Sequence, residues 1–449
     1  MTRKFKTADY EKTLELQISL GDVLPPDHLA RFIVDIVSQL DLQSIYKQYS
    51  DQGAPPYAPE ILLGLLIYGY ATGVFSSRKI EQATYEVIPF RFIAGDMHPD
   101  HDTIAHFRQQ FLAELKELFV QILLIAQAMG YLQVGNVSLD GSKIHADASK
   151  SKAVSYKRLL VIEAYLQVEV NELFTLAEAA DGGQLPAEMN VTAEIDRREQ
   201  QLARLAEAKK VLEARAQARY EAEKAEYDAK IQTRQEKAAK KGGNPPGRPP
   251  TPGPRDKDQY NFTDPESRLM KNATNSGFDQ HYNVQVVVEH ESRLVVGNWV
   301  CDHPNDKQAA LPTIDTVPPQ LGQPKKANLD TGYFSEDTIA DLQTRGIDPY
   351  IATGRSPHHQ GWRAFFLDNP DPPPETASVK EHMAYKLRTA LGKAVYRLRK
   401  STVEPVIGII KEVLGFRQFS LRGISAAAGE WTLVCLAYNL KRLHTLHFD

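Results

Sequence analysis

The chain has 449 residues, 42% of them hydrophobic, and a formal net charge of -4. Its length allows about two to four domains. Its slightly acidic balance excludes a uniformly basic nucleic-acid-binding protein, so any DNA contact must come from local patches.

Three further features of the sequence indicate the cellular location and the redox environment. The chain has only two cysteines, which excludes a disulfide framework and a cysteine-based zinc cluster and suits a reducing cytoplasm. The start, Met-Thr-Arg-Lys-Phe-Lys, has no apolar run behind it and does not resemble a signal peptide. The most apolar run, residues 61–74, is too short to span a bilayer. We therefore expect a cytoplasmic protein with no membrane partner.

Residues 1–130 are predicted to form an all-helical N-terminal domain. Apolar residues recur at helical spacing along this segment, and prolines and glycines separate the expected helices. Helices over 76–87 and 102–111, with a turn between them, could form a helix-turn-helix that binds DNA. The second helix would then present Thr103, His106, Arg108 and Gln109 to phosphates or base edges. An ordinary helical bundle is the alternative, and the pattern alone favours it.

A buried strand is predicted over residues 136–139, with Asp140 at its end. If the strand continues, side chains alternate, so that Asp140 and Ser142 face one way while Lys143 and Asp147 face the other. Asp140 and Asp147 therefore cannot easily share a metal ion, and other carboxylates must come to Asp140 from elsewhere in the fold.

Residues 151–263 are predicted to be an insertion. Two long helical stretches, over 155–180 and 191–241, are separated by a Gly-Gly break and followed by a Pro/Gly-rich linker. This pattern indicates an antiparallel helical hairpin whose longer arm would reach roughly 75 Å. Such an arm could grip DNA or a second subunit, or it could be a solvated spacer.

Residues 131–150 and 264–449 together are predicted to form the catalytic domain. After the first strand come a strand hairpin over 281–301, a helix, a strand over 326–330, a helix, a strand over 349–353 and C-terminal helices. This is the order of an α/β fold with an RNase H-like mixed sheet and flanking helices.

Three acids are candidates for one site in that fold. Asp330 ends its strand as Asp140 does, and neighbouring strand ends can bring both carboxylates to one metal ion. Glu404 and Glu412, in the helical region that follows, are candidates for a third ligand. Carboxylates of this kind can hold the magnesium ions used for phosphodiester chemistry.

Glu404 could instead be structural, because Ser401-Thr-Val-Glu404 is a capping-box pattern. The surrounding charge favours a phosphate-binding role. Only Glu404 and Glu412 oppose nine basic residues: Lys386, Arg388, Lys393, Arg397, Arg399, Lys400, Lys411, Arg417 and Arg422.

At these motifs the chain resembles the DDE transposases of bacterial insertion sequences, most closely the eleven-eighty-two group. The matching stretches are Val-Ser-Leu-Asp140-Gly-Ser-Lys, Asp264-Pro-Glu-Ser-Arg-Leu-Met, Ala-Asn-Leu-Asp330-Thr-Gly-Tyr, Arg-Lys-Ser-Thr-Val-Glu404-Pro-Val-Ile-Gly-Ile-Ile-Lys411 and Pro99-Asp-His-Asp-Thr-Ile-Ala-His-Phe-Arg108. The resemblance implies a catalytic, metal-binding triad of Asp140, Asp330 and Glu404, with Mg²⁺ as the cofactor and Mn²⁺ as a substitute.

The resemblance also bears on partners. It favours the helix-turn-helix interpretation and implies action on terminal inverted repeats and target DNA, as a homodimer or larger assembly on the nucleoid. It leaves two rivals: a catalytically inactive DNA-binding descendant, and a stand-alone nuclease of the same fold.

One departure from related transposases concerns the last catalytic helix, which in them carries Tyr-x2-Arg-x3-Glu-x6-Lys. Here Tyr396 and Arg399 are present, but four residues separate Arg399 from Glu404. In an unbroken helix, Arg397, Lys400, Glu404 and Lys411 would share a face and Arg399 would point away. We therefore expect Lys400 and Lys411 to contact phosphates, with Arg397 on their face and Tyr396 as a weaker candidate.

Overall fold

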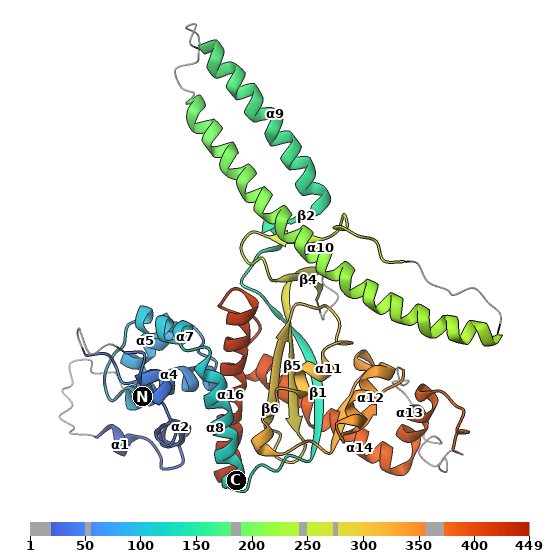
Figure 1. The fold of residues 1–449 in the computed structure, drawn as a ribbon. Coiled ribbons are helices and arrows are strands. Elements are labelled where there is room, and N and C mark those ends of the chain that lie inside the picture. Colours follow the sequence, from blue (N-terminus) through green and yellow to red (C-terminus); the bar gives the residue numbers. More distant parts are fainter. Residues whose placement is uncertain are drawn as a thin grey trace, which may run out of the picture.

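The computed structural model describes residues 19–49, 55–180, 190–241, 249–272, 277–354 and 372–448. Its centre is a mixed six-stranded sheet in the order β4-β5-β1-β7-β8, with β6 also paired to β5 (Figure 1). The strands are β1 (Asn136–His145), β4 (Arg268–Lys271), β5 (Phe278–Glu289), β6 (Val295–Cys301), β7 (Lys326–Leu329) and β8 (Asp348–Ile351). β5 is antiparallel to β1, whereas β7 and β8 continue the sheet in parallel. The predicted α/β class with a mixed sheet is confirmed.

Strand β1 is longer than predicted. It does not end at Leu139, because β5 pairs with it from Val137, opposite Glu289, to His145, opposite His281. Its parallel pairing with β7 stops much earlier, at Ser138 opposite Asn328. Asp140 therefore lies within a strand but beyond the part of it that β7 covers.

Helices from the second half of the chain flank the sheet, with α11 against β5 and β6 and α12 and α13 against β8. They are α11 (Ala310–Ile314), α12 (Glu336–Thr344), α13 (Val379–Arg388), α14 (Ala390–Ser401) and α15 (Val403–Gly408), with short helical turns η2 (Pro319–Leu321), η3 (Thr331–Tyr333) and η5 (Ile409–Val413). Ser335 caps the start of helix α12, where its hydroxyl accepts a hydrogen bond from the Thr338 amide at 3.0 Å. Helices α14 and α15 pack across β1, with α14 also reaching β7 and β8.

The N-terminal helices share one hydrophobic core with the sheet. They are α1 (Leu20–Val23), α2 (Leu29–Ser38), α3 (Gln43–Tyr46), α4 (Pro59–Thr72), α5 (Ser77–Glu86), α6 (Ile88–Ala94), α7 (His101–Gln110) and α8 (Glu114–Ala128). The last helix, α16 (Ile424–Phe448), stands between them and the sheet, packing on α4 and α8 on one side and on β6 on the other (Figure 1). The Trp431 indole of α16 donates to the Gln285 carbonyl of β5 at 3.2 Å.

Two observations concern the N-terminal helices. Helix α6 lies between α5 and α7, so the two helices expected to form a helix-turn-helix are joined by a third helix as well as a turn. Within the described residues no single helix is long and apolar enough to span a membrane; α4 and α5 meet the criteria only as a pair bent by 97°.

The insertion contains the two predicted long helices, α9 (Tyr156–Ala180) and α10 (Val191–Lys241), which project from the sheet (Figure 1). They pack antiparallel through small apolar clusters such as Leu159 and Leu166 of α9 with Leu205 and Leu212 of α10. The ion pair of Arg198 with Glu169 and that of Lys209 with Glu163 follow the same register.

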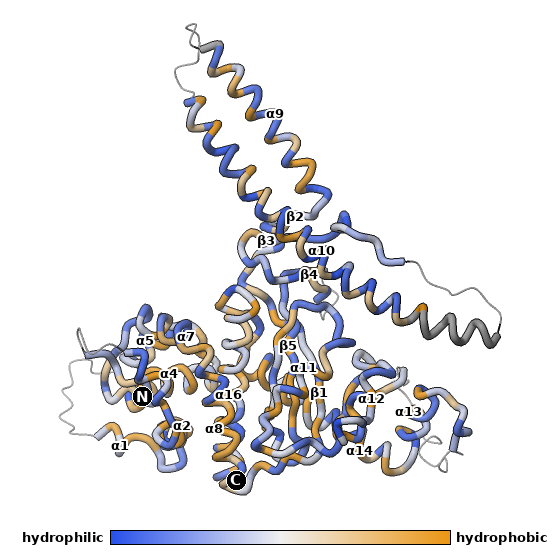
Figure 2. Tube along the Cα trace, viewed as in Figure 1, coloured by the Kyte–Doolittle hydropathy of each residue, from blue (hydrophilic) through white to orange (hydrophobic). Residues whose placement is uncertain are grey.

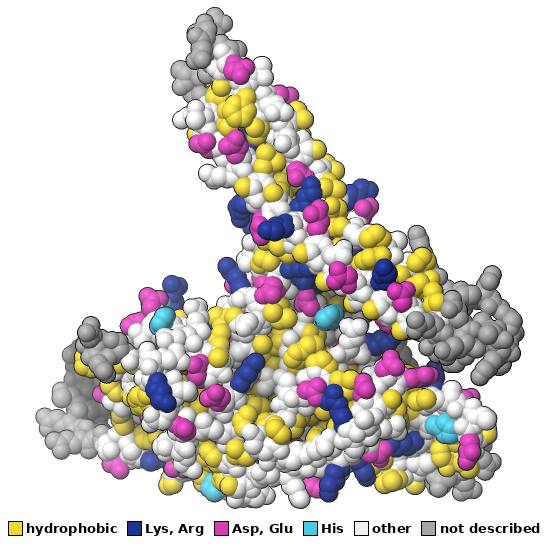
Figure 3. All heavy atoms as spheres, in the orientation of Figure 1, with side chains coloured by type: hydrophobic (Ala, Val, Ile, Leu, Met, Phe, Trp, Pro, Cys, Tyr) yellow, Lys and Arg dark blue, Asp and Glu magenta, His cyan; other side chains and the backbone are white. Residues whose placement is uncertain are grey.

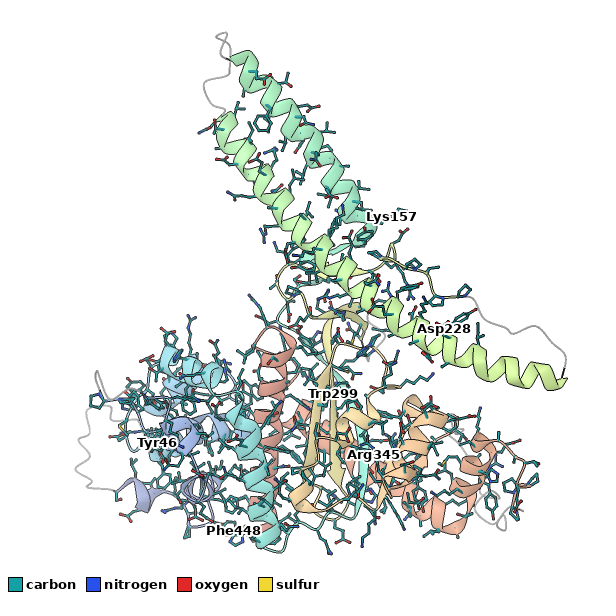
Figure 4. The ribbon with its side chains drawn as sticks, viewed as in Figure 1. Tyr46, Lys157, Asp228, Trp299, Arg345 and Phe448 are labelled. Carbon is teal, nitrogen blue, oxygen red and sulfur yellow. The ribbon has the colours of Figure 1, made fainter. Side chains whose placement is uncertain are left out.

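At the base of the hairpin, η1 (Lys150–Lys152) leads into β2 (Ala153–Ser155), which pairs with β3 (Gln259–Asn261) as a two-stranded sheet that the sequence did not predict. Helix α10 is twice as long as α9 and runs on past this base. Figure 4 places Lys157 beside the base and Asp228 on the part of α10 beyond it. There Arg219 pairs with Asp258 at 2.9 Å.

Candidate active site

Asp140 and Asp330 lie on neighbouring parallel strands. Ser138 and Asn328 are the last pair between these strands, so Asp140 and Asp330 each lie two residues beyond it. Asp330 follows β7 directly, and its Oδ1 accepts a hydrogen bond from the Gly332 amide at 2.7 Å. Burial raises the pKa of Asp140 to about 6; the Arg399 guanidinium opposes that rise and the Asp330 charge adds to it. The two carboxylates are therefore electrostatically coupled, as adjacent strand ends predict.

Arg399 joins Asp140 to Glu404. One guanidinium nitrogen donates to Asp140 Oδ2 at 2.8 Å and another to Glu404 Oε1 at 2.9 Å. The Arg399 and Asp140 side chains are only 13% and 18% exposed, whereas Glu404 is 42% exposed. The expectation that Arg399 points away is wrong. It is the cation around which these two acids gather.

A break in the helix explains the difference. Helix α14 ends at Ser401, Thr402 leaves helical geometry with φ -115° and ψ -82°, and α15 starts at Val403. Pro405 has no amide hydrogen to donate to the preceding turn, so one continuous helix is disfavoured here. Glu404 consequently does not share a face with Lys400.

The capping-box alternative for Glu404 also fails. The Ser401 hydroxyl donates to the Leu398 carbonyl at 3.1 Å, and no side-chain cap forms at the start of α15. The Glu404 carboxylate binds Arg399 instead.

Two other residues of the Tyr-x2-Arg-x3-Glu-x6-Lys signature, Lys411 and Tyr396, lie near these acids. Lys411 Nζ donates to Ser142 Oγ at 3.0 Å, on the strand face that carries Asp140. Burial lowers the pKa of Lys411, and the nearby Arg417 lowers it further. Tyr396 is half-buried beside Arg399; burial raises the pKa of its phenol, and the Arg399 charge opposes that rise. Both side chains are thus within the candidate site, while Lys400 is exposed.

The predicted DNA-binding side chains of α7 divide into two groups. His106 and Gln109 are exposed, and Thr103 is half-buried with its hydroxyl bound to the Asp100 cap at 2.9 Å. Arg108 is buried, and its guanidinium donates to the Tyr70 hydroxyl at 3.0 Å and to a backbone carbonyl. The prediction that Arg108 reaches DNA is wrong, because this guanidinium faces the core.

Two family models match the chain. One, described as "Transposase domain (DUF772)", covers residues 18–110, and the other, described as "Transposase DDE domain", covers residues 373–444. These matches indicate a DDE-type transposase. The first spans the N-terminal helices to the end of α7, and the second contains Tyr396, Arg399, Glu404 and Lys411. No curated protein and no solved structure matches the chain.

A buried polar network next to Asp140 was missed by sequence reasoning. On β5, the Gln285 carboxamide donates to Asp306 at 2.7 Å and accepts from the Tyr333 hydroxyl, and Asn283 also donates to Asp306 at 2.8 Å. A Cβ at Gly141 would overlap the Gln285 carboxamide. The signal in the sequence was two carboxamides at alternate positions of β5, Asn283 and Gln285, which face one side together.

Asp306 adds a fourth carboxylate near the site. At Gly332, the position of a Cβ would lie 2.9 Å from Asp330 Oδ1 and 3.5 Å from Asp306 Oδ2. The two carboxylates therefore flank the same glycine, one carried by η3 and the other by the loop after β6.

The predicted basic cluster separates into paired and unpaired members. Salt bridges join Lys386 to Asp348, Arg399 to Asp140 and Glu404, Arg417 to Glu412, and Arg422 to Asp147. Four exposed members make no ion pair with any residue that the structure describes: Arg388, Lys393, Arg397 and Lys400. Three of them recur at helical spacing on α14 and form an exposed basic stripe, Lys393, Arg397 and Lys400.

The donor chemistry of the site fits a divalent metal. DDE transposase domains generally use divalent metals, and the available donors are carboxylate oxygens, which magnesium prefers. In the described part of the chain no group of three or more His, Cys, Asp or Glu side chains is arranged to hold a metal ion. Instead, Arg399 supplies the positive charge between Asp140 and Glu404. Asp140 and Glu404 are thus both ion-paired with the Arg399 guanidinium.

Proposed function

We propose that the chain is a DNA transposase of the eleven-eighty-two group that binds terminal inverted repeats and catalyses metal-dependent phosphodiester hydrolysis and strand transfer. The motif resemblance and the two transposase-domain matches support this function. The sheet supports an RNase H-like catalytic domain, because β5 is antiparallel to β1 while β7 and β8 are parallel to it.

The catalytic residues of this proposal are Asp140, Asp330 and Glu404. The observation that carries it is their convergence: the charges of Asp140 and Asp330 act on each other, and Arg399 joins Asp140 to Glu404. These carboxylates would hold Mg²⁺, for which Mn²⁺ would substitute. When bound, such ions activate the attacking oxygen and stabilise the leaving one.

The residues around the triad have separate roles in the proposal. Lys411, held against Ser142 beside the acids, would orient the scissile phosphate. Arg399 would hold Asp140 and Glu404 in position. Tyr396 lies next to Arg399 and would contact the DNA at the same place.

DNA would lie along the exposed basic stripe, where unpaired cations can replace the counterions of phosphates. His106 and Gln109 of α7 are the exposed candidates for reading the terminal repeats, with Thr103 at the start of that helix. The transposase would act as a homodimer or larger assembly on the nucleoid in the cytoplasm.

Strand cleavage tests the proposal. The full chain is incubated with magnesium and duplex DNA that carries the end of its own element, and the products are resolved on denaturing gels. Wild type is expected to cleave at the repeat end and to join the freed 3′ end to target DNA. Asp330→Ala should abolish both reactions, whereas Asp337→Ala, an exposed acid in the first turn of α12, should leave them unchanged.

The products distinguish the rival functions. Full cleavage by Asp330→Ala would overturn the catalytic assignment. Hydrolysis without joining would favour a stand-alone nuclease, and specific binding without cleavage by wild type would favour an inactive descendant.

A further inference from the structure

Four buried polar side chains form a hydrogen-bonded network close to the candidate acids. We name it the break network: Ser138 of β1, His290 after β5, Asn328 of β7 and Thr402 between α14 and α15. Each is at most 8% exposed. Figure 3 shows charged side chains at the surface around α12, whereas these four lie in the interior, within a sheet whose hydrophobic positions Figure 2 shows. Buried polar groups cost free energy unless they bond to one another, so a satisfied network favours one fixed arrangement.

The contacts of the break network join two strands to the helix break. The Thr402 hydroxyl shares its hydrogen between Ser138 Oγ, at 3.1 Å, and the Leu398 carbonyl, at 2.8 Å. On the neighbouring strand, the Asn328 carboxamide donates to the Val395 carbonyl of α14 at 2.8 Å. Both β1 and β7 are therefore bonded either to α14 or to the residue that follows it.

His290 joins the network from a third strand, directly after the end of β5. Its Nε2 lies 2.9 Å from Ser138 Oγ and 3.4 Å from the Asn328 carboxamide nitrogen. Burial lowers the pKa of His290 to about 4, so the ring is neutral at pH 7 and Nε2 can accept from the serine hydroxyl. The His290 amide donates to the Asn136 carbonyl of β1 at 3.1 Å, which holds the ring beside that strand.

The spacing of the network in the sequence matches the spacing of the candidate acids. Three members each precede an acid by two residues: Ser138 before Asp140, Asn328 before Asp330, and Thr402 before Glu404. Along extended backbone, side chains two residues apart face the same way. Both strand members therefore face the side of the sheet that their acids face, and they are also paired with each other in the sheet.

Thr402 is the member at the break itself, and its hydroxyl does not cap a helix. A threonine directly before a helix usually accepts a hydrogen bond from an amide of the first turn, but no such bond forms at the start of α15. The hydroxyl is bonded to Ser138 instead. Arg399 lies three residues before Thr402 and Glu404 two residues after it, so the position of Thr402 affects both charged groups.

We propose that the break network positions the candidate site: it fixes the α14–α15 break against β1 and β7 and so holds Glu404 and Arg399 in register with the two aspartates. The inference rests on the proposed function, because the roles of the acids are assigned there. The four network side chains are positioning residues, which act only through the acids that follow them. Contacts that orient metal ligands typically change metal affinity or activity by about tenfold to a hundredfold.

Thr402→Val tests the network, because valine keeps the shape of threonine and removes the hydroxyl. The rate of terminal-repeat cleavage in magnesium at saturating DNA should fall about tenfold or more, with the DNA concentration for half-maximal rate unchanged. The affinity for Mn²⁺, measured from the electron paramagnetic resonance of the free ion, should fall at least threefold, because the acids are no longer held together. Thr402→Ser keeps the hydroxyl and should restore both.

Thr432→Val on α16 is the matched control. Thr432 is also 2% exposed, and its hydroxyl likewise bonds to the carbonyl four residues earlier, of Ala428, and to a side chain on a strand, Asn298 of β6, both at 3.0 Å. This variant should lose a similar amount of stability in urea and keep wild-type cleavage and Mn²⁺ affinity. Equal losses of cleavage in Thr402→Val and Thr432→Val, or no rescue by Thr402→Ser, would overturn the proposal.

Ser138→Ala removes the other end of the same hydrogen bond. It should slow cleavage as Thr402→Val does, and the double variant should be about as slow as the slower single variant, because the two residues act as one unit. Losses that multiply in the double variant would show that the residues act separately, and the network would then have no role as a unit.

Hydrogen exchange separates failure of this proposal from failure of the proposed function. Amides of α14 and α15 should exchange at least tenfold faster in Thr402→Val than in wild type, with those of α16 unchanged, whether or not the chain cleaves DNA. A wild-type chain that neither cleaves DNA nor binds Mn²⁺ would refute the proposed function, and the exchange rates would still test the network. Unchanged exchange in α14 and α15 would overturn the positioning role.

Discussion

Replacing Arg399 by methionine should destabilise the metal-free protein strongly at alkaline pH. Arg399 and Asp140 are largely buried, and removing one partner of a buried pair costs about 3–5 kcal/mol. The pair with Glu404 adds at most about 1 kcal/mol, because Glu404 is 42% exposed and solvent screens it. Since Asp140 retains some solvent contact, we expect a loss near the lower limit, about 3 kcal/mol at pH 8.

The loss should depend on pH with a defined sign. The pKa of Asp140 is about 6 in the folded protein, above its ordinary 3.8. A raised acid pKa stabilises the folded state below about pH 4, and this contribution is lost as the pH rises through 6. At pH 5 Asp140 is mostly protonated and gains little from Arg399, so the same substitution should cost only about 1 kcal/mol, the value of a hydrogen bond.

Urea unfolding in a chelating buffer at pH 5 and pH 8 measures both losses. Arg397→Met, an exposed arginine on the same helix, is the matched control and should change stability little at either pH. Adding Asp140→Asn to Arg399→Met should recover much of the loss at pH 8, because the buried charge is then gone. Equal losses at the two pH values, or no recovery in the double variant, would refute the assigned role of this ion pair.

Three further predictions concern DNA binding and the core. Lys400→Glu should weaken DNA binding and lower the slope of log affinity against log salt by at least about 1, measured by fluorescence anisotropy over a salt series; an unchanged slope would remove Lys400 from the DNA path. Arg108→Met should cost about 2 kcal/mol in urea unfolding and leave that salt slope unchanged, because Arg108 binds buried groups. His106→Ala should instead leave stability unchanged and weaken binding to terminal-repeat DNA. Gly141→Ala should displace Gln285 and slow strand cleavage at least tenfold with circular dichroism unchanged; wild-type cleavage would show that the network next to Asp140 is dispensable.

Features that depend on local pattern could be predicted from the sequence. The two long helices of the insertion follow from apolar residues at helical spacing, and their antiparallel packing follows from the break between them. Ser335, a residue type that favours the cap position, caps α12, and β7 ends at Leu329, immediately before Asp330. Each of these depends on residues that are close in sequence.

Features that depend on residues distant in the sequence could not be predicted from it. The end of β1 is set by β5, which is separated from it by the whole insertion. The inward turn of Arg399 needs both the break at Thr402 and the carboxylate of Asp140 on another strand. Pro405 is a local reason for a helix break, but hydrophobic periodicity does not give the direction that the chain takes after the break.

The buried state of Arg108 is a third case. On pattern alone it is a polar residue on an amphipathic helix, and such residues are usually exposed. Its guanidinium instead donates to Tyr70, whose hydroxyl donates to the buried Glu430 of α16 at 2.8 Å. Glu430 also accepts from the amides of Ser420 and Leu421 at 2.9 and 3.1 Å. These partners come from the two ends of the chain, so only the tertiary structure reveals them.

A change of metal preference at Asp330 tests the central claim most directly. A thiolate ligand binds the softer manganese ion better than it binds magnesium, and Asp330 is half-buried at the start of η3, where a cysteine fits. If Asp330 is a metal ligand, Asp330→Cys should lose at least a hundredfold of its cleavage of terminal-repeat DNA in magnesium and recover much of it in manganese, whereas Asp330→Ala should recover in neither. Full cleavage by Asp330→Cys in magnesium, or equal rescue of the alanine variant by manganese, would contradict the triad of Asp140, Asp330 and Glu404.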